Sequence, residues 1–197
     1  SHVGLEARAR SRGFGDIVRE ARALAASGHR ELIVTGVNMG TYRDGTYRLG
    51  DVIRALCDID GLDRIRLSSI EPTTIDGAIV DEMAAGGKLC PYLHVPLQAG
   101  DDGVLAAMRR RYTAAEYRAF MEGVVERVPH VGLGTDIMVG FPGESEAAFA
   151  NSVEMISALP FTHIHVFSFS ARPRTTAYGM ADKVPADVIR SRSRRMH

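Results

Sequence analysis

The sequence predicts an α/β fold in which about five parallel strands alternate with outer helices, arranged as a partial (β/α) barrel. Five short apolar runs end near Thr35, Ser69, Leu97, Gly140 and Ser170, and apolar residues at helical spacing fill the stretches between them. Strict alternation of this kind predicts parallel strands with right-handed crossovers. Every run also ends in small or polar residues, so we expect the five strand ends to meet on one rim and form one site there.

The first half of the chain contains three strands and three helices. A helix is expected over residues 16–27, with Gly28 as its stop. A buried strand over 31–35 leads into a glycine-containing loop, and the polar residues 41–48 read as an exposed loop or lid. A helix begins at Leu49, a strand covers 64–69, and a helix follows from Ile75 until Gly86. The third strand covers residues 92–97.

The second half begins with a short helix around Val104 and a longer one, for which Thr113 and Glu116 form a capping box. The strand over 131–140 ends because Pro142 lacks a backbone donor and Gly143 permits positive φ. Ser145 is placed as the N-cap of the next helix. A strand over 162–170 and a helix from about residue 184 complete the chain.

The turn after residue 140 is the stretch around which we expect a site. Gly140 and Gly143 carry no side chain, which would let a flat or bulky ligand approach the backbone closely. Asp136 and Glu144 place carboxylates at or near the strand end, where α/β folds bind ligands. The alternative is an ordinary strand-to-helix turn with solvated acids.

Composition limits the class of protein. The 197 residues are 45% hydrophobic, which suits one domain with a sizeable core. The 24 basic and 24 acidic side chains cancel, so the net charge gives no overall drive toward nucleic acid, although a local basic patch is compatible with it. We expect a cytoplasmic protein with no membrane association, because no apolar run approaches the roughly 18 residues of a membrane helix and no signal peptide is visible.

The two cysteines and the two ends of the chain carry further expectations. Cys57 and Cys90 have no metal-ligand spacing and read as small core residues of a reducing compartment. We divide the chain into a basic arm or tag-derived segment over residues 1–12 and a core over residues 13–197. The arginine-rich run 190–197 lacks an apolar anchor, which is typical of a frayed or truncated helix.

Six stretches together resemble the radical S-adenosylmethionine methylthiotransferases, which attach methylthio groups to tRNA adenosines or to a ribosomal protein. They are TGVN (35–38), RLSSIEP (66–72), HVPLQ (94–98), MRRRYT (108–113), GTDIMVGFPGE (134–144) and FSARP (169–173). The TGVN version most resembles the branch that modifies threonylcarbamoyladenosine next to the anticodon. The resemblance implies a radical SAM, TIM-like partial barrel that lacks its first strand.

The resemblance also has departures. The family's loop with three cysteines spaced C-x3-C-x2-C, which binds the [4Fe–4S] cluster, has no counterpart here, and Arg174 stands where the family more often has glycine. The resemblance therefore implies S-adenosylmethionine as cofactor and [4Fe–4S] clusters in the full-length enzyme, with none expected in this chain. It implies tRNA as the partner of the full-length enzyme.

Site residues are carried over from the resemblance position by position. Residues expected around the cofactor are Gly36, Asn38, Ser69, Glu71, Gln98, Asp136, Val139, Gly140, Phe141, Ser170 and Arg172. Arg109, Arg110 and Arg111 are expected to hold a substrate carboxylate or phosphate. Each strand-end residue has a structural alternative, a polar group that only satisfies the strand end. His94 reads as an interior hydrogen-bonding residue, and His163 and His165 as neighbours on one face of a strand.

The leading hypothesis is the core of a tRNA-modifying radical SAM methylthiotransferase, inactive alone because the cluster cysteines are missing. The alternatives are a ribosomal-protein methylthiotransferase core, a cluster-free lyase and a non-catalytic binding or scaffold module. A lyase would need a lysine at a strand end, and neither Lys88 nor Lys183 lies at one. An exposed edge beside residues 31–35 predicts self-association, which a monomer by light scattering at high concentration would contradict.

Overall fold

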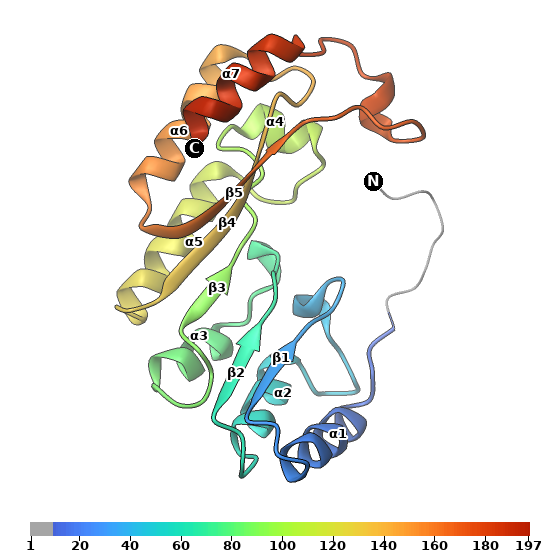
Figure 1. Cartoon of the computed structure of the whole chain (residues 1–197), viewed down its shortest axis with the longest axis vertical. Coiled ribbons are helices and arrows are strands. Elements are labelled where there is room, and N and C mark those ends of the chain that lie inside the picture. Colours follow the sequence, from blue (N-terminus) through green and yellow to red (C-terminus); the bar gives the residue numbers. More distant parts are fainter. Residues whose placement is uncertain (1–9) are drawn as a thin grey trace. The chain divides into compact units, whose positions relative to one another are not determined.

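Five strands alternate with helices in the computed structural model, which describes residues 10–197 (Figure 1). The strands are β1 (Glu31–Val34), β2 (Arg64–Leu67), β3 (Tyr92–His94), β4 (Gly132–Val139) and β5 (Phe161–Ser168). The helices are α1 (Phe14–Ala26), α2 (Leu49–Cys57), α3 (Gly77–Ala84), α4 (Asp102–Ala107), α5 (Ala114–Arg127), α6 (Glu146–Ala158) and α7 (Ala186–Met196). The predicted α/β class with parallel strands is confirmed, and each expected strand is present, several ending two or three residues earlier than predicted.

The described residues fall into two compact units. One comprises the residues up to Val95 together with Met121–Leu133, and we call it the β1–β2 unit. The other comprises Pro96–Phe120 and Gly134–His197, and we call it the β4–β5 unit. Most of the basic arm expected over residues 1–12 lies outside the described residues, which begin at residue 10. The expectation of a single core over residues 13–197 stays a prediction.

In the β1–β2 unit, the first two strands pair in parallel, with Glu31 opposite Arg64 and Val34 opposite Leu67. Strand residues alternate between two faces. Ile65 lies on the face that α2 covers and is fully buried. Glu31 lies on the other face, where its carboxylate accepts hydrogen bonds from the guanidinium groups of Arg64 and Arg66, 2.5 and 2.9 Å away. These bonds hold the pKa of Glu31 below its ordinary value.

The strand β1 lies at the edge of its sheet. Ile33, on the open face, is 64% exposed, and Val37 in the following loop is fully exposed. The unpaired edge on which the prediction of self-association rests is therefore present in the described part of the chain, while self-association itself stays a prediction.

The predicted loop over residues 41–48 is fastened to the start of α1. The Phe14 ring stacks on the Tyr47 ring with centroids 4.0 Å apart. The Phe14 backbone N–H donates to the Asp44 carboxylate over 2.7 Å, and the Tyr42 hydroxyl donates to the Arg12 carbonyl over 2.9 Å. Through these contacts, all within the β1–β2 unit, the segment packs against the start of α1.

In the β4–β5 unit, a buried hydroxyl network connects α5 to β4. The Thr135 hydroxyl accepts from the Leu97 backbone N–H over 3.0 Å and lies 3.2 Å from the Tyr117 hydroxyl. Tyr117 is fully buried, and burial raises the pKa of its phenol. The predicted capping box at the start of α5 is confirmed, because Thr113 and Glu116 exchange side-chain-to-backbone hydrogen bonds.

The expectation that the arginine-rich run 190–197 has no apolar anchor is wrong. On α7, Arg192 is 5% exposed and Met196 is 8% exposed. Arg192 donates to the carboxylate of Glu144, itself 4% exposed, over 2.7 Å. Glu144 is therefore a buried partner of α7, and the arginine-rich run is held to the turn after β4 by this ion pair. Within residues 10–197, no helix has the length and apolar character that crossing a bilayer requires.

We expect Arg192→Ala to lower the free energy of unfolding by about 3–5 kcal/mol, because it leaves the Glu144 carboxylate buried without its partner. The matched control is Arg195→Ala, which removes an exposed ion pair with Glu146 and is expected to cost about 0–1 kcal/mol. Both arginines also lie over the Phe149 ring, so that contact is lost in each variant. Denaturant unfolding measures the difference, and equal losses would contradict a stabilising role for the buried pair.

Candidate functional site

The site residues predicted in the β1–β2 unit lie just after the C-terminal ends of its two paired strands. Val34 and Leu67 are the last paired residues of β1 and β2, and Gly36 and Ser69 each follow by two residues. Gly36, Asn38 and Ser69 are exposed, and Glu71 is half-buried. The Asn38 carbonyl accepts from the Thr41 backbone over 3.2 Å and begins a turn of 3-10 helix over Met39–Thr41. The structure thus places these four predicted residues in the segments that follow the C-terminal ends of β1 and β2.

In the β4–β5 unit, Gln98 lies beside the middle of β4. Its backbone N–H donates to the Asp136 carbonyl over 2.8 Å, and its carbonyl accepts from the Met138 N–H over 2.9 Å. Gln98 has φ of 69°, a left-handed conformation that costs free energy for a residue other than glycine. Backbone strain of this kind concentrates at functional positions, so it supports a role for Gln98.

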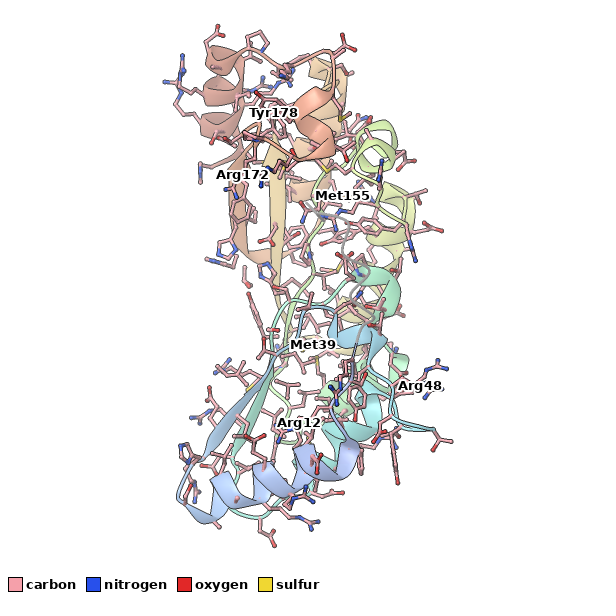
Figure 2. The ribbon with its side chains drawn as sticks, turned by 90° about the vertical axis from the view of Figure 1, so that its right-hand side faces the viewer. Arg12, Met39, Arg48, Met155, Arg172 and Tyr178 are labelled. Atoms are coloured by element: carbon pink, nitrogen blue, oxygen red, sulfur yellow. The ribbon has the colours of Figure 1, made fainter. Side chains whose placement is uncertain are left out.

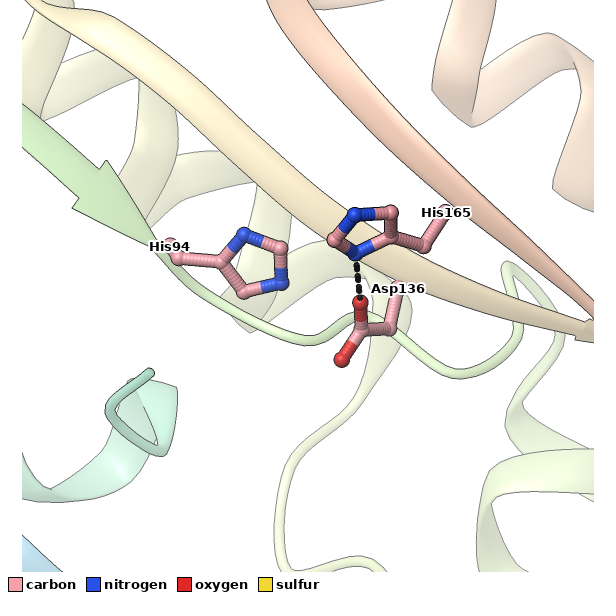
Figure 3. Close-up of side chains that lie close together, drawn as sticks. All are labelled: His94, Asp136 and His165. Carbon is pink, nitrogen blue, oxygen red and sulfur yellow. Dashed lines mark hydrogen bonds and ion pairs between the residues drawn. The ribbon is translucent and has the colours of Figure 1, made fainter. Parts of the chain in front are cut away.

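Asp136 forms a side-chain pair with His165 that the sequence did not reveal (Figure 3). The His165 Nδ1 atom lies 3.0 Å from Asp136 Oδ1. The His165 side chain is 50% exposed and that of Asp136 is 21% exposed. His163 and His165 share a face of β5, as predicted, and their Nε2 atoms lie 2.8 Å apart. Asp136, His165 and His163 therefore form one hydrogen-bonded chain on β4 and β5.

Val139, Gly140 and Phe141 are buried in the β4–β5 unit, and their expected place around the cofactor stays a prediction. Val139 is fully buried, and Phe141 is 7% exposed and packs edge-on against Phe169 with ring centroids 5.5 Å apart. Gly140 has φ of 81°, and its N–H donates to the Glu144 carboxylate over 2.7 Å. A Cβ atom at Gly140 would lie 2.3 Å from the Ile189 side chain. The space that glycine leaves is therefore filled by α7, and not left for a ligand.

The remaining predicted residues of the β4–β5 unit lie on its surface. Ser170 and Arg172 are exposed on the segment that follows β5, and Figure 2 labels Arg172 there. Arg109 and Arg111 are exposed, and Arg110 is half-buried. Arg174 has φ of 69°, so this position keeps the left-handed conformation that favours glycine although it carries arginine. The expected meeting of all five strand ends on one rim spans both units and stays a prediction.

The cysteines do not fit an iron–sulfur cluster. A cluster needs several thiolate ligands, and the whole sequence has only Cys57 and Cys90. Both are half-buried, so the expectation of small core residues is only partly met. Burial, together with the nearby carboxylate of Glu82, raises the pKa of the Cys57 thiol to about 11, which keeps it protonated at neutral pH.

The chain belongs to the Radical SAM superfamily, whose sequence profile matches residues 3–156. Among curated proteins it is similar to the tRNA-2-methylthio-N(6)-dimethylallyladenosine synthase of Salinispora arenicola, with 38% identity over 195 residues that cover 98% of this chain and 39% of that protein. The protein of the same name from Nocardia farcinica is 38% identical over 193 residues, covering 92% of this chain and 38% of that protein.

These names confirm the resemblance to the methylthiotransferases at the level of the family. The chain spans about two fifths of the length of these relatives. Both names specify dimethylallyladenosine, so they give no support to the threonylcarbamoyladenosine branch that the TGVN loop favoured, and that branch stays a prediction.

Two solved structures share the fold. A radical S-adenosylmethionine methyltransferase from Kitasatospora setae, with cobalamin and a [4Fe-4S] cluster bound, aligns with 80% of this chain and 31% of its own, at a TM-score of 0.64 and 20% identity. The Elp3 protein of Methanocaldococcus infernus aligns with 90% of this chain and 49% of its own, at a TM-score of 0.56 and 13% identity. At these identities the likeness concerns the fold alone.

We expect Gly140→Ala to destabilise the chain more than Gly143→Ala. Both glycines have left-handed φ values, 81° and 85°, so both variants incur a backbone cost of about 1 kcal/mol. Only Gly140 meets another side chain, that of Ile189, while a Cβ at Gly143 would have open space around it. The clash adds about 1–3 kcal/mol. Thermal or denaturant unfolding measures the gap, and equal stability of the two variants would show that Ile189 does not need the glycine.

Proposed function

We propose that this chain is the cofactor-binding core of a radical SAM methylthiotransferase that acts on an adenosine of tRNA next to the anticodon. The observation that carries the proposal is the 38% identity over 98% of this chain to a protein named as a tRNA methylthio-adenosine synthase. The names of these relatives support tRNA over a ribosomal protein as the substrate. The whole enzyme's activity and partner belong to this proposal, because the chain spans only part of those relatives.

The donor set suits S-adenosylmethionine, which presents an amine, a carboxylate, two ribose hydroxyls and an adenine. In the β1–β2 unit, the amide of Asn38 and the carboxylate of Glu71 suit the amine and the hydroxyls. In the β4–β5 unit, Asp136 offers a carboxylate and Gln98 an amide in a strained backbone. Ser170 and Arg172 add a hydroxyl and a guanidinium that suits a carboxylate. Each of these residues is proposed as a cofactor contact within its own unit.

Val139, Gly140 and Phe141 have a narrower role in this proposal. The side chains of Val139 and Phe141 are buried, and the Gly140 N–H already donates to Glu144. We therefore propose that these residues stabilise the end of β4 by packing in the core. Arg109 and Arg111 are exposed and suit the phosphates of an RNA substrate. Arg110, which is half-buried, belongs to the same basic segment.

Bound together with a reduced cluster, S-adenosylmethionine would supply radical chemistry. In this proposal the thiolates for that cluster lie outside this sequence, because Cys57 and Cys90 are too few to hold it. We therefore expect the purified chain, reconstituted anaerobically with iron and sulfide, to retain no [4Fe–4S] absorbance and to cleave no S-adenosylmethionine. Retention of iron together with cofactor cleavage would contradict the proposed inactivity of the chain alone. A Cys57→Ser, Cys90→Ser double variant is the control for adventitious iron on these two thiols.

Cofactor binding is tested by calorimetric titration with S-adenosylhomocysteine. We expect binding by the chain and at least a tenfold weaker affinity for Asp136→Ala, a loss of about 1.4 kcal/mol or more. The matched control is Asp187→Ala, which removes an exposed carboxylate in the first turn of α7 and is expected to bind as the unaltered chain does.

Unchanged affinity of the Asp136→Ala variant would contradict the assignment of Asp136, and absence of binding by every form would contradict a preformed cofactor site in this chain. Circular dichroism on both variants separates a lost contact from a lost fold.

A further inference from the structure

The paired histidines of β5 lie outside the residues assigned above to cofactor and substrate. His163 and His165 are two positions apart, so both side chains project from the same face of the strand. Both are exposed. Their rings are nearly perpendicular, at 88°, with centroids 4.4 Å apart, and the Nε2 atoms approach to 2.8 Å. Two imidazole nitrogens thus converge on one point at the surface of the β4–β5 unit.

The proton positions follow from Asp136. A carboxylate only accepts hydrogen bonds, so the 3.0 Å contact places a proton on Nδ1 of His165 and makes its Nε2 atom the acceptor of the ring (Figure 3). In the metal-free chain, that atom accepts the Nε2 proton of His163. A carboxylate that fixes the Nδ1–H tautomer of a histidine is the arrangement that commonly supports histidine ligands of zinc.

We propose that His163 and His165 form a two-imidazole site for a divalent transition cation of the zinc class, with Asp136 positioning His165. Zinc–imidazole bonds of about 2.0–2.1 Å place two ligand nitrogens about 2.8–3.0 Å apart at a bond angle of about 90° and about 3.3–3.4 Å apart at about 110°. The observed 2.8 Å therefore needs only a few tenths of an ångström of separation, which exposed side chains can provide. When the cation binds, the His163 proton moves from Nε2 to Nδ1, with no net release of protons.

The ligand set also indicates what the site prefers. Imidazole nitrogen suits zinc, copper and nickel, whereas calcium and magnesium prefer oxygen. Two protein ligands are fewer than the four of a structural zinc site, so water would complete the coordination and binding would be correspondingly weaker. The site needs no thiolate, which separates it from the iron–sulfur chemistry of the superfamily.

Calorimetric titration of the chain with Zn²⁺ tests the proposal. Every form carries His2→Ala, so that this additional imidazole contributes no Zn²⁺ ligand. We expect one Zn²⁺ per chain, at least tenfold weaker binding in His163→Ala, and about 10–100-fold weaker binding in Asp136→Asn. The control is His130→Ala, which removes an exposed histidine of the other unit and should leave the affinity unchanged. Magnesium should not compete.

Two outcomes would overturn the site. One is Zn²⁺ binding that is equal in His163→Ala and in the unaltered chain. The other is binding that disappears on alkylation of Cys57 and Cys90 instead. Circular dichroism of each variant excludes unfolding as the cause of a loss. Zn²⁺ binding by a chain that does not bind S-adenosylhomocysteine would support the histidine site while contradicting the proposed cofactor site, so the two failures are distinguishable.

Discussion

The buried ion pair between Glu144 and Arg192 is the interaction on which the β4–β5 unit depends. The Glu144 carboxylate accepts from the Gly140 backbone N–H and from Arg192, so one side chain connects the end of β4 to α7. Burial raises the pKa of Glu144 above its ordinary value, and the two hydrogen bonds oppose that rise. A charge buried in this way is tolerable only while its partners remain, so the position of α7 and the shape of the turn are fixed together.

This constraint decides which part of β4 can face a ligand. Ile189 fills the space above Gly140, and Val139 and Phe141 lie in the core. The alternation of a strand then leaves Asp136 and Met138 as the partly exposed residues, while Ile137 and Val139 are buried. Asp136, in the middle of the strand, is therefore the partly exposed carboxylate of β4, whereas Val139 and Gly140, at and just after its end, are buried.

The elements of the fold were predictable because each depends on local pattern. Apolar runs gave the five strands, and the capping box of Thr113 and Glu116 gave the start of α5. The errors arose where a long-range partner decides. Nothing local marks Arg192 as buried, because its partner Glu144 lies 48 residues away. The Asp136–His165 pair likewise requires the relative register of β4 and β5, which the sequence of either strand does not contain.

The polar groups on the open surface of β4 and β5 differ in kind from those of an iron–sulfur site. Thiolate ligands require a cysteine that loses its proton easily, and burial works against that at Cys57. Imidazole needs only the correct tautomer, and Asp136 sets it at His165. Asp136 is also one of the residues proposed above to contact the cofactor. A cation on His163 and His165 and a cofactor beside Asp136 would therefore share one charge, so that binding of either would alter the affinity for the other.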